Sequence, residues 1–292
     1  MKKILIFVFL FILSFSHLGW SVDFRYLRTN EGLYNGEINS IVQDQSGKMW
    51  FATWTGLANY NGFDFRFFKP ELGNPKSLPD KKTHRILIDS ENDLWLASLS
   101  GVSVYDRNTE TFYPLALEGH TTNDYYVNNL YESKGFILIH TSRGIFLVDR
   151  KNKFKSGLSA KRLFLFENNN RVDDYAHYMN VFEDKLFIVS NRDAYNPDRI
   201  LIAEIGLTQT DTILNVINRQ IFNRNINRVT YSKAEKKIFI GTIDGISLCE
   251  TDNNYRIVDQ VYFKGRSITQ LICASDHRLY CSGSIPELLW VD

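Results

Sequence analysis

The chain has 292 residues, and its 34 Lys and Arg nearly balance its 33 Asp and Glu. This balance gives no electrostatic reason to expect a nucleic acid or an anionic membrane as partner. The three cysteines are odd in number and too few for a disulfide framework. We interpret them as small buried apolar residues, although Cys273 and Cys281 could pair if they lie on neighbouring strands in an oxidising compartment.

Residues 1–21 have the pattern of a secretory signal peptide. The basic start Met1-Lys2-Lys3 precedes an almost unbroken apolar run from Ile4 to Phe15, and Gly19-Trp20-Ser21 offers small residues for cleavage. A transmembrane helix needs roughly 20 apolar residues, so the shorter run favours a cleaved signal over an uncleaved anchor. We therefore predict export, with a periplasmic (extracytoplasmic) mature region over 22–292.

A repeat of about 45 residues begins soon after this segment. Its clearest copy runs from Ile38 to Gly62 and has an alternating strand, the polar turn Asp44-Gln45-Ser46-Gly47, and a second strand around Trp50. The turn Thr53-Trp54-Thr55-Gly56 then leads into a third strand. An Asp side chain that accepts backbone N–H groups, followed by a glycine with positive φ, is hairpin chemistry.

Further copies follow with decreasing fidelity. The glycine of the third strand returns at Gly101 after 45 residues, at Gly144 after another 43, and again at Gly245. Trp95 repeats the position of Trp50. The other copies are marked by Leu138–Ile145, Met179–Ser190, Phe239–Ile246 and a last unit that starts at Ile268.

Each unit holds about four short strands, and no convincing helix separates them. A period of 40 to 50 residues with four strands per unit is typical of a β-propeller, in which each sheet is covered by its neighbours. We predict an all-β fold, a β-propeller of four-stranded antiparallel blades, with six blades visible in a seven-bladed ring. Trp50 and Trp95 should pack between blades. The blades are expected near 36–69, 80–115, 123–156, 173–206, 224–262 and 266–292.

The segment Ile38 through Gly62 closely resembles the repeat of the two-component regulator propeller family, and Asn30-Glu31-Gly32-Leu33 resembles the segment that opens such propellers. In that family the propellers form the extracytoplasmic sensor of hybrid histidine kinases, many of which detect polysaccharide breakdown products. The resemblance therefore implies a carbohydrate-sensing domain in signal transduction. No kinase or output segment is recognisable here, so the sequence is either an N-terminal fragment or closes its ring with help from Val22–Arg28.

The resemblance also implies partners. These are the remaining blades or a membrane-bound histidine kinase. An incomplete ring would leave an unpaired sheet edge and uncovered blade faces, which would also favour a homodimer. The ligand expected is an oligosaccharide or another small extracellular molecule.

Ligand contacts are expected where the first strand starts, the second ends and the third begins, because antiparallel strands bring these points to one end of each blade. Aromatic rings there suit sugar C–H groups, and Arg, Asn and Asp suit hydroxyls or acidic substituents. The candidates are Trp54, His84, Arg85, Tyr125, Tyr126, Arg143, His177, Arg192 and Arg228, with Tyr175, Asp193, Asn227 and Asp244 as weaker ones.

Two other classes of function stay open. One is a stand-alone propeller enzyme of the lyase or lactonase type, for which His84 and His177 could meet across the channel. No two histidines of the mature region have metal-ligand spacing, and no catalytic motif is present. The other is a protein-docking propeller. We expect a non-enzymatic chain with no catalytic residues, no metal site and no cofactor.

Overall fold

The computed structural model describes residues 37–121, 124–154, 157–172, 175–191, 198–207, 212–222, 224–252, 254–274, 278–283 and 289–291. They belong to one compact unit, Glu37–Asp292. The predicted signal peptide and the segment Val22–Arg28 lie outside the described residues. Within them the secondary structure is β throughout, apart from one short 3-10 helix, Arg150–Asn152.

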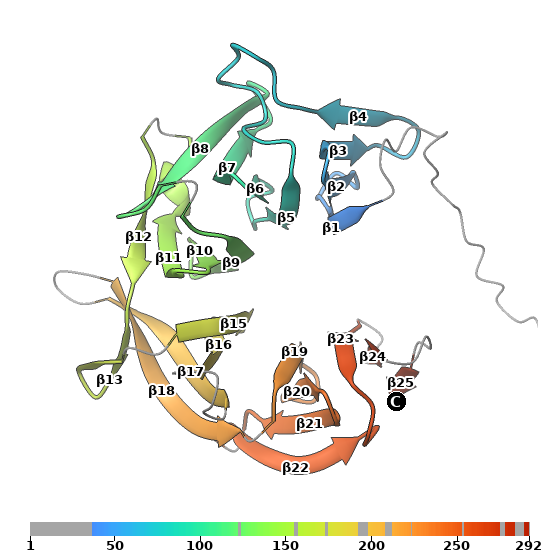
Figure 1. Cartoon of the computed structure of the whole chain (residues 1–292), viewed down its shortest axis with the longest axis vertical. Helices are drawn as coiled ribbons and strands as arrows, with labels where there is room; N and C mark the ends of the chain where they lie inside the picture. The colour runs from blue at the N-terminus through green and yellow to red at the C-terminus, as the bar shows by residue number, and fades with distance from the viewer. Residues whose placement is uncertain are drawn as a thin grey trace, which may run out of the picture. The chain divides into compact units, whose positions relative to one another are not determined.

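The strands form antiparallel sheets that follow one another along the chain (Figure 1). The first two sheets contain β1 (Ile38–Gln43), β2 (Met49–Thr53), β3 (Gly56–Tyr60) and β4 (Phe65–Phe68), then β5 (Thr83–Ile88), β6 (Leu94–Ser98), β7 (Gly101–Asp106) and β8 (Thr111–Leu117). The third contains β9 (Val127–Ser133), β10 (Phe136–Thr141), β11 (Gly144–Asp149) and β12 (Ser159–Leu163).

The later sheets are less regular. The hairpin β13 (Leu165–Glu167) and β14 (Asn170–Val172) precedes a fourth sheet of β15 (Tyr175–Phe182), β16 (Lys185–Asn191), β17 (Asp198–Leu207) and β18 (Thr212–Phe222). The fifth contains β19 (Ile226–Ser232), β20 (Lys237–Thr242), β21 (Gly245–Glu250) and β22 (Arg256–Tyr262), and the sixth β23 (Ile268–Cys273), β24 (Leu279–Gly283) and β25 (Leu289–Val291).

Two parallel pairings connect the outer edges of these sheets. Strand β8 pairs with β12, which joins the second and third sheets, and β13 pairs with β18 at the edge of the fourth. Such pairing satisfies backbone groups that an edge strand leaves open. The third sheet extends to Leu163 and the fourth to Phe222, beyond the expected ends at 156 and 206, because β12 pairs with β11 and β18 pairs with β17 as fourth strands.

The recurring Thr/Ser-x-x-Gly sequence forms the turn between the second and third strands. The Thr53 hydroxyl donates to the Gly56 carbonyl at 2.9 Å and accepts the Thr55 N–H at 3.1 Å. The same hydroxyl-to-carbonyl bond joins Ser98 to Gly101, Thr141 to Gly144 and Thr242 to Gly245. Each glycine has a φ between +109° and +137°, which only glycine adopts without strain.

The Asp of the polar turn and the Trp of the second strand act together. Asp44 accepts the backbone N–H groups of Ser46 and Lys48 and the Trp50 indole N–H at 2.9 Å. Asp89 holds the Trp95 indole in the same way, at 3.0 Å. Satisfying its only polar atom lets each indole be buried completely.

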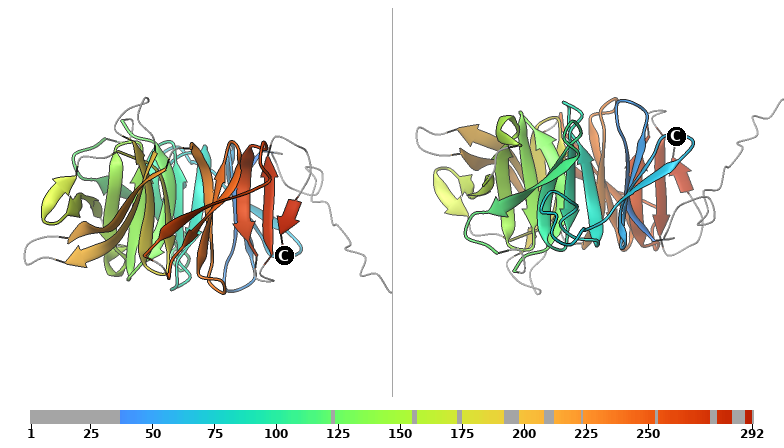
Figure 2. Two further views of the ribbon diagram at one scale, coloured as in Figure 1. Left: turned by 90° about the horizontal axis from the view of Figure 1, so that it is seen from below. Right: turned by 90° about the horizontal axis from the view of Figure 1, so that it is seen from above.

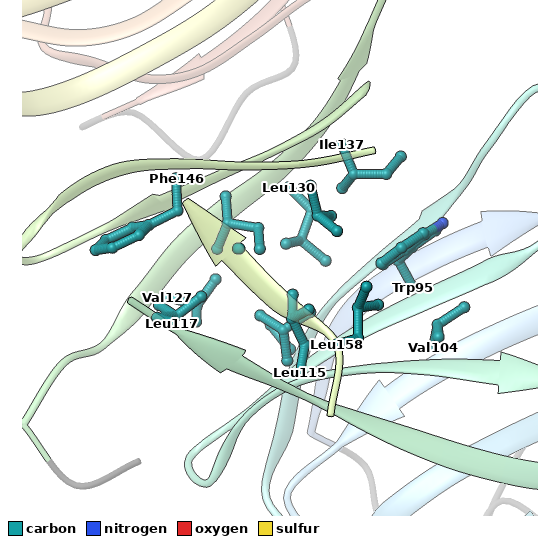
Figure 3. Packing of buried hydrophobic residues seen from close by; sticks show 14 of the residues in the cluster. Trp95, Val104, Leu115, Leu117, Val127, Leu130, Ile137, Phe146 and Leu158 are labelled. Carbon is teal, nitrogen blue, oxygen red and sulfur yellow. The ribbon is translucent and has the colours of Figure 1, made fainter. Parts of the chain in front are cut away.

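Buried apolar clusters lie between consecutive sheets, from the first pair to the last. Figure 3 shows Trp95 of the second sheet in one buried cluster with Leu130 and Ile137 of the third. Trp50 packs in the same way against Ile86 and Leu94 of the second sheet. The two tryptophans therefore pack between blades, as predicted.

The first strand of every sheet lies innermost, and β1, β5, β9, β15, β19 and β23 contact one another in that order. The sheets of this unit thus fan about a common centre (Figure 1), and Figure 2 shows the same sheets edge-on. The predicted all-β propeller of four-stranded antiparallel blades is confirmed. The seven-bladed count stays a prediction, because the described strands form six such blades, the last with three strands, which hydrogen bonds join into five continuous sheets.

The three cysteines, two of which could have paired, are all free in the structure. Cys273 and Cys281 lie on neighbouring strands but pair in register with Leu279 and Leu271 respectively, and both are free, as is the buried Cys249.

In the part of the chain that the structure describes, no helix has the length and apolar character to cross a membrane.

Candidate functional site

A β-bulge recurs near the start of each innermost strand. One residue on this strand has no partner on the second strand, and it is followed by a residue that resumes the pairing. The unpaired residues are Asn39, His84, Asn128, His177, Asn227 and Thr269. The residues that follow them are Ser40, Arg85, Asn129, Tyr178, Arg228 and Gln270. Bulges re-aim side chains, so two series of side chains with different directions arise from one repeated irregularity.

The second series lines a cavity of about 510 Å³ between the innermost strands. All six residues that follow a bulge contribute to its wall, together with Asn39, Tyr126, Asn128, Tyr131, His140, His177 and Met179. The wall therefore draws on every sheet of the unit. It combines three tyrosine rings with amide, guanidinium and imidazole groups, a mixture that can stack on a ligand and bond it directionally.

Three residues of the first series, together with one histidine from a second strand, bond a sheet to the one that follows it. Asn39 donates to the Thr83 carbonyl at 2.9 Å, and Asn227 donates to the Ile268 carbonyl at 2.9 Å. His84 bonds the Val127 carbonyl at 2.8 Å, and His140 bonds the Ala176 carbonyl at 2.8 Å. Each bond runs from one sheet to the backbone of the following sheet, so together they fix the spacing of the strands that form the cavity.

Part of the chain matches a known family of propeller proteins. Residues 33–55 match the family model described as two component regulator propeller. The chain is thus similar to the two-component regulator propellers. This match covers the first repeat, and it confirms the resemblance inferred from the sequence. No curated protein matches the chain.

Solved structures extend the likeness of the fold. The extracellular domain of BT3049 from B. thetaiotaomicron, described as a hybrid two component system, has 18% identity and a TM-score of 0.62 over 92% of this chain and 35% of that chain. PorZ of Porphyromonas gingivalis, a component of the type-IX secretion system, has 13% identity and a TM-score of 0.61 over 85% and 37%. Hydrazine synthase of Kuenenia stuttgartiensis has 10% identity and a TM-score of 0.56 over 88% and 77%.

The coverage and the sequence identity of these matches define how far the similarity extends. The chain spans about a third of the length of the BT3049 and PorZ chains. At identities of 10 to 18% the comparison shows a shared propeller fold. A fold hosts many functions, so the function must be argued from the site.

The sequence-predicted site residues of this regulator-like propeller fall into three groups. Arg85, Tyr126, His177 and Arg228 all line the central cavity. Sequence reasoning brought these four together because they lie at or near the starts of innermost strands.

His84 and Tyr125 are buried elements of the fold and are absent from the cavity wall. His84 is 2% exposed, bonds Val127 and stacks under Tyr126 with ring centroids 4.6 Å apart. Burial lowers the pKa of His84. Tyr125 lies in the apolar cluster between the second and third sheets. A meeting of His84 with His177 across the channel, which the sequence left open, is therefore not what the structure shows, since the bulge directs the His84 ring toward β9.

The remaining candidates lie elsewhere. Trp54 is half-buried in the turn between β2 and β3, and Arg143 lines a separate pocket of about 220 Å³ together with Arg162 and Arg171. Arg192 lies outside the described residues, as does Asp193. Asn227 ties β19 to β23, and Asp244 accepts the Gly265 N–H at 2.8 Å.

Nine cavity residues were missed by sequence reasoning: Asn39, Ser40, Asn128, Asn129, Tyr131, His140, Tyr178, Met179 and Gln270. Aligning the innermost strands of the repeats, rather than their turns, would have revealed Ser40, Asn129, Tyr178 and Gln270, because these four share one register position.

Among the described residues, no three His, Cys, Asp or Glu side chains gather closely enough to hold a metal ion.

Proposed function

We propose that the chain is an extracytoplasmic, ligand-sensing propeller of a two-component signalling system, and that it recognises an oligosaccharide in the central cavity. One observation carries the proposal: the residue after each bulge, in all six sheets, faces a single cavity. A site assembled from every repeat uses the whole fold to hold one ligand. The sensor role draws on the regulator-propeller match and on the printed description of BT3049.

Location and partners form part of the same proposal. Residues 1–21 would direct export, and the ligand-loaded propeller would act on a membrane-bound histidine kinase or on further blades. The chain corresponds to about a third of the BT3049 domain in length, which is consistent with a sensor that works as one part of a larger assembly.

The test is to screen the purified chain against a panel of oligosaccharides by thermal shift and to measure the affinity of each ligand found by calorimetry. A specific ligand stabilises the folded state by an amount set by its concentration relative to its Kd. Tyr126→Ala removes an exposed ring from the cavity wall and should weaken binding by about tenfold, given the usual strength of ring stacking. Trp54→Ala removes a ring outside the cavity and should leave binding unchanged.

Two outcomes would contradict the proposal. One is a panel in which no oligosaccharide stabilises the chain, and the other is an equal loss of binding in both variants. Chromatography of the panel after prolonged incubation tests the non-catalytic role, because a sensor returns its ligand intact and a lyase would release fragments.

A further inference from the structure

The two arginines of the cavity wall occupy equivalent positions in the second and fifth sheets. Arg85 and Arg228 each follow the bulge residue of an innermost strand. Each donates through Nη1 to the carbonyl of that bulge residue, Arg85 to His84 at 2.8 Å and Arg228 to Asn227 at 2.9 Å. The repeated bond fixes both guanidinium groups on rigid strands before any ligand arrives, which lowers the entropy lost on binding.

These contacts leave most guanidinium donors available. Arg85 also donates through Nε to the Asn128 carbonyl at 3.0 Å, so two of its five N–H groups are committed in these bonds, and one is committed for Arg228. Every partner is a neutral carbonyl. In the part of the chain that the structure describes, neither arginine forms an ion pair with a carboxylate.

The rest of the wall contains no compensating charge. Its thirteen residues include no Asp or Glu, and the two arginines share it with neutral amides, hydroxyls, tyrosines and two histidines. Both arginines are half-buried. Partly buried cations without a carboxylate partner carry an electrostatic cost that an anion would relieve.

The two charges act on a common point. Tyr131 accepts the Asn129 amide at 3.0 Å and donates to the Met179 carbonyl. Burial raises the pKa of the Tyr131 hydroxyl, whereas Arg85 and Arg228 both act to lower it. Although they come from different sheets, both guanidinium groups therefore lie within electrostatic reach of the same hydroxyl.

From this geometry we propose that the cavity selects an anionic ligand, an oligosaccharide that bears carboxylate or sulfate groups, which Arg85 and Arg228 hold with charge-assisted hydrogen bonds. The inference rests on the proposed function and narrows its ligand class. The guanidinium fork matches the two oxygens of a carboxylate or sulfate. The tyrosines and amides of the wall would bind the neutral part of the sugar.

Calorimetry with four matched probes tests the charge requirement on the purified chain. The probes are a galacturonate trisaccharide, its fully methyl-esterified form, neutral galactotriose and a sulfated galactose trisaccharide. We expect at least one charged probe to bind at least tenfold more tightly than both uncharged ones, and its Kd to rise with salt because the contacts are ionic. Binding by the sulfated probe alone would identify sulfate as the anion, and binding by the galacturonate probe would identify carboxylate.

Variants locate the effect. Arg228→Gln should weaken binding of the charged probe by at least tenfold. Arg228→Lys keeps the charge but lacks the guanidinium fork, so it should weaken binding less. Arg143→Gln removes a positive charge from the separate pocket and should change nothing. Thermal melts of the ligand-free variants show whether each one is folded. Arg85→Gln serves as the second cavity variant; Arg85 has one more hydrogen bond to the backbone than Arg228.

The outcomes separate the two proposals. If the methyl ester or galactotriose binds as tightly as the charged probes, the anionic inference is overturned and the oligosaccharide sensor stands. Unchanged binding in the Arg85 and Arg228 variants would overturn it as well. If none of the four probes binds, the anionic inference is overturned, and the wider oligosaccharide panel decides whether the proposed function stands.

Discussion

In the second sheet, the residue that bulges out of the innermost strand contacts the next sheet, and its successor lines the central cavity. His84 and Arg85 illustrate the difference, since one ring is buried against Val127 and the other side chain lines the cavity. Composition alone does not distinguish them, because both are polar residues at the start of a strand. At this scale, one position of register decides whether a side chain stabilises the fold or is available to a ligand.

The buried histidines predict a pH dependence of stability. His84 and His140 each bond a backbone carbonyl, and burial is the main cause that lowers the pKa of both. The unfolded chain takes up protons near the ordinary histidine pKa of 6.5, while the folded chain resists them. The free energy of unfolding should therefore be fully retained above that pH and fall as the pH is lowered below it, by at most about 1.4 kcal/mol per pH unit for each histidine.

Urea titrations at pH 7.5 and pH 5.5 would measure this loss. The variant His84→Gln, His140→Gln keeps an N–H donor at each site but does not titrate, so its stability should change less between the two pH values. Equal changes in the parent chain and the variant would show that other groups cause the dependence.

The turn between the second and third strands shows how a short motif determines an element. Thr53 closes the turn through its hydroxyl, and Gly56 adopts a φ of +137° that permits the third strand to start at once. A Cβ on Gly56 would lie 2.4 Å from the Phe68 carbonyl oxygen. The motif recurs in the first, second, third and fifth sheets, where the hydroxyl and the glycine with positive φ return together.

Gly56→Ala should therefore destabilise the chain more than Gly62→Ala. Both glycines have positive φ, but a Cβ on Gly62 would meet nothing within 4 Å. Both variants incur the left-handed strain of about 1–2 kcal/mol, and Gly56→Ala adds a clash of about 1–3 kcal/mol with a backbone that cannot move freely. Chemical denaturation at neutral pH would compare them, and equal losses would show that the turn relaxes.

In the unit as a whole, the outward face of the first sheet and that of the last sheet are more exposed than the faces that pack between sheets. Ile41 and Ile86 occupy the same register position, two residues after the bulge, yet Ile41 is 51% exposed and Ile86 only 8%. Ile86 packs in the cluster between the first and second sheets. On the last innermost strand Ile272 is 61% exposed, whereas its equivalents Val42 and Leu87 pack against the following sheet.

This asymmetry predicts unequal effects of one substitution. Ile86→Ala should cost about 2–5 kcal/mol, as buried truncations do, and Ile41→Ala less than about 1 kcal/mol, as exposed ones do. Thermal or urea unfolding of the two variants would measure the difference. If Ile41→Ala proves as costly as Ile86→Ala, its face is covered in solution, and melting temperatures that rise with protein concentration would identify a second copy as the cover.

Much of the architecture could be read from local signals. The Asp-x-x-Gly turn, the tryptophan of the second strand and the Thr/Ser-x-x-Gly turn each depend on bonds within a few residues, so the sequence showed them directly. Four cavity residues followed from the same reasoning. The parallel pairings of β12 with β8 and of β18 with β13 did not follow from it, because these strands meet partners that are distant in the chain, and no local pattern indicates such a partner.

The sequence by itself determined the repeat, the strand count within each unit and the packing role of the tryptophans, because these rest on spacing, turn chemistry and burial of apolar faces. Only the tertiary structure decided which polar side chains meet. A bulge shifts the register by one residue and so exchanges the sides of neighbouring residues. The cavity therefore contains Arg85 and Arg228 together, while His84 supports the fold beside it.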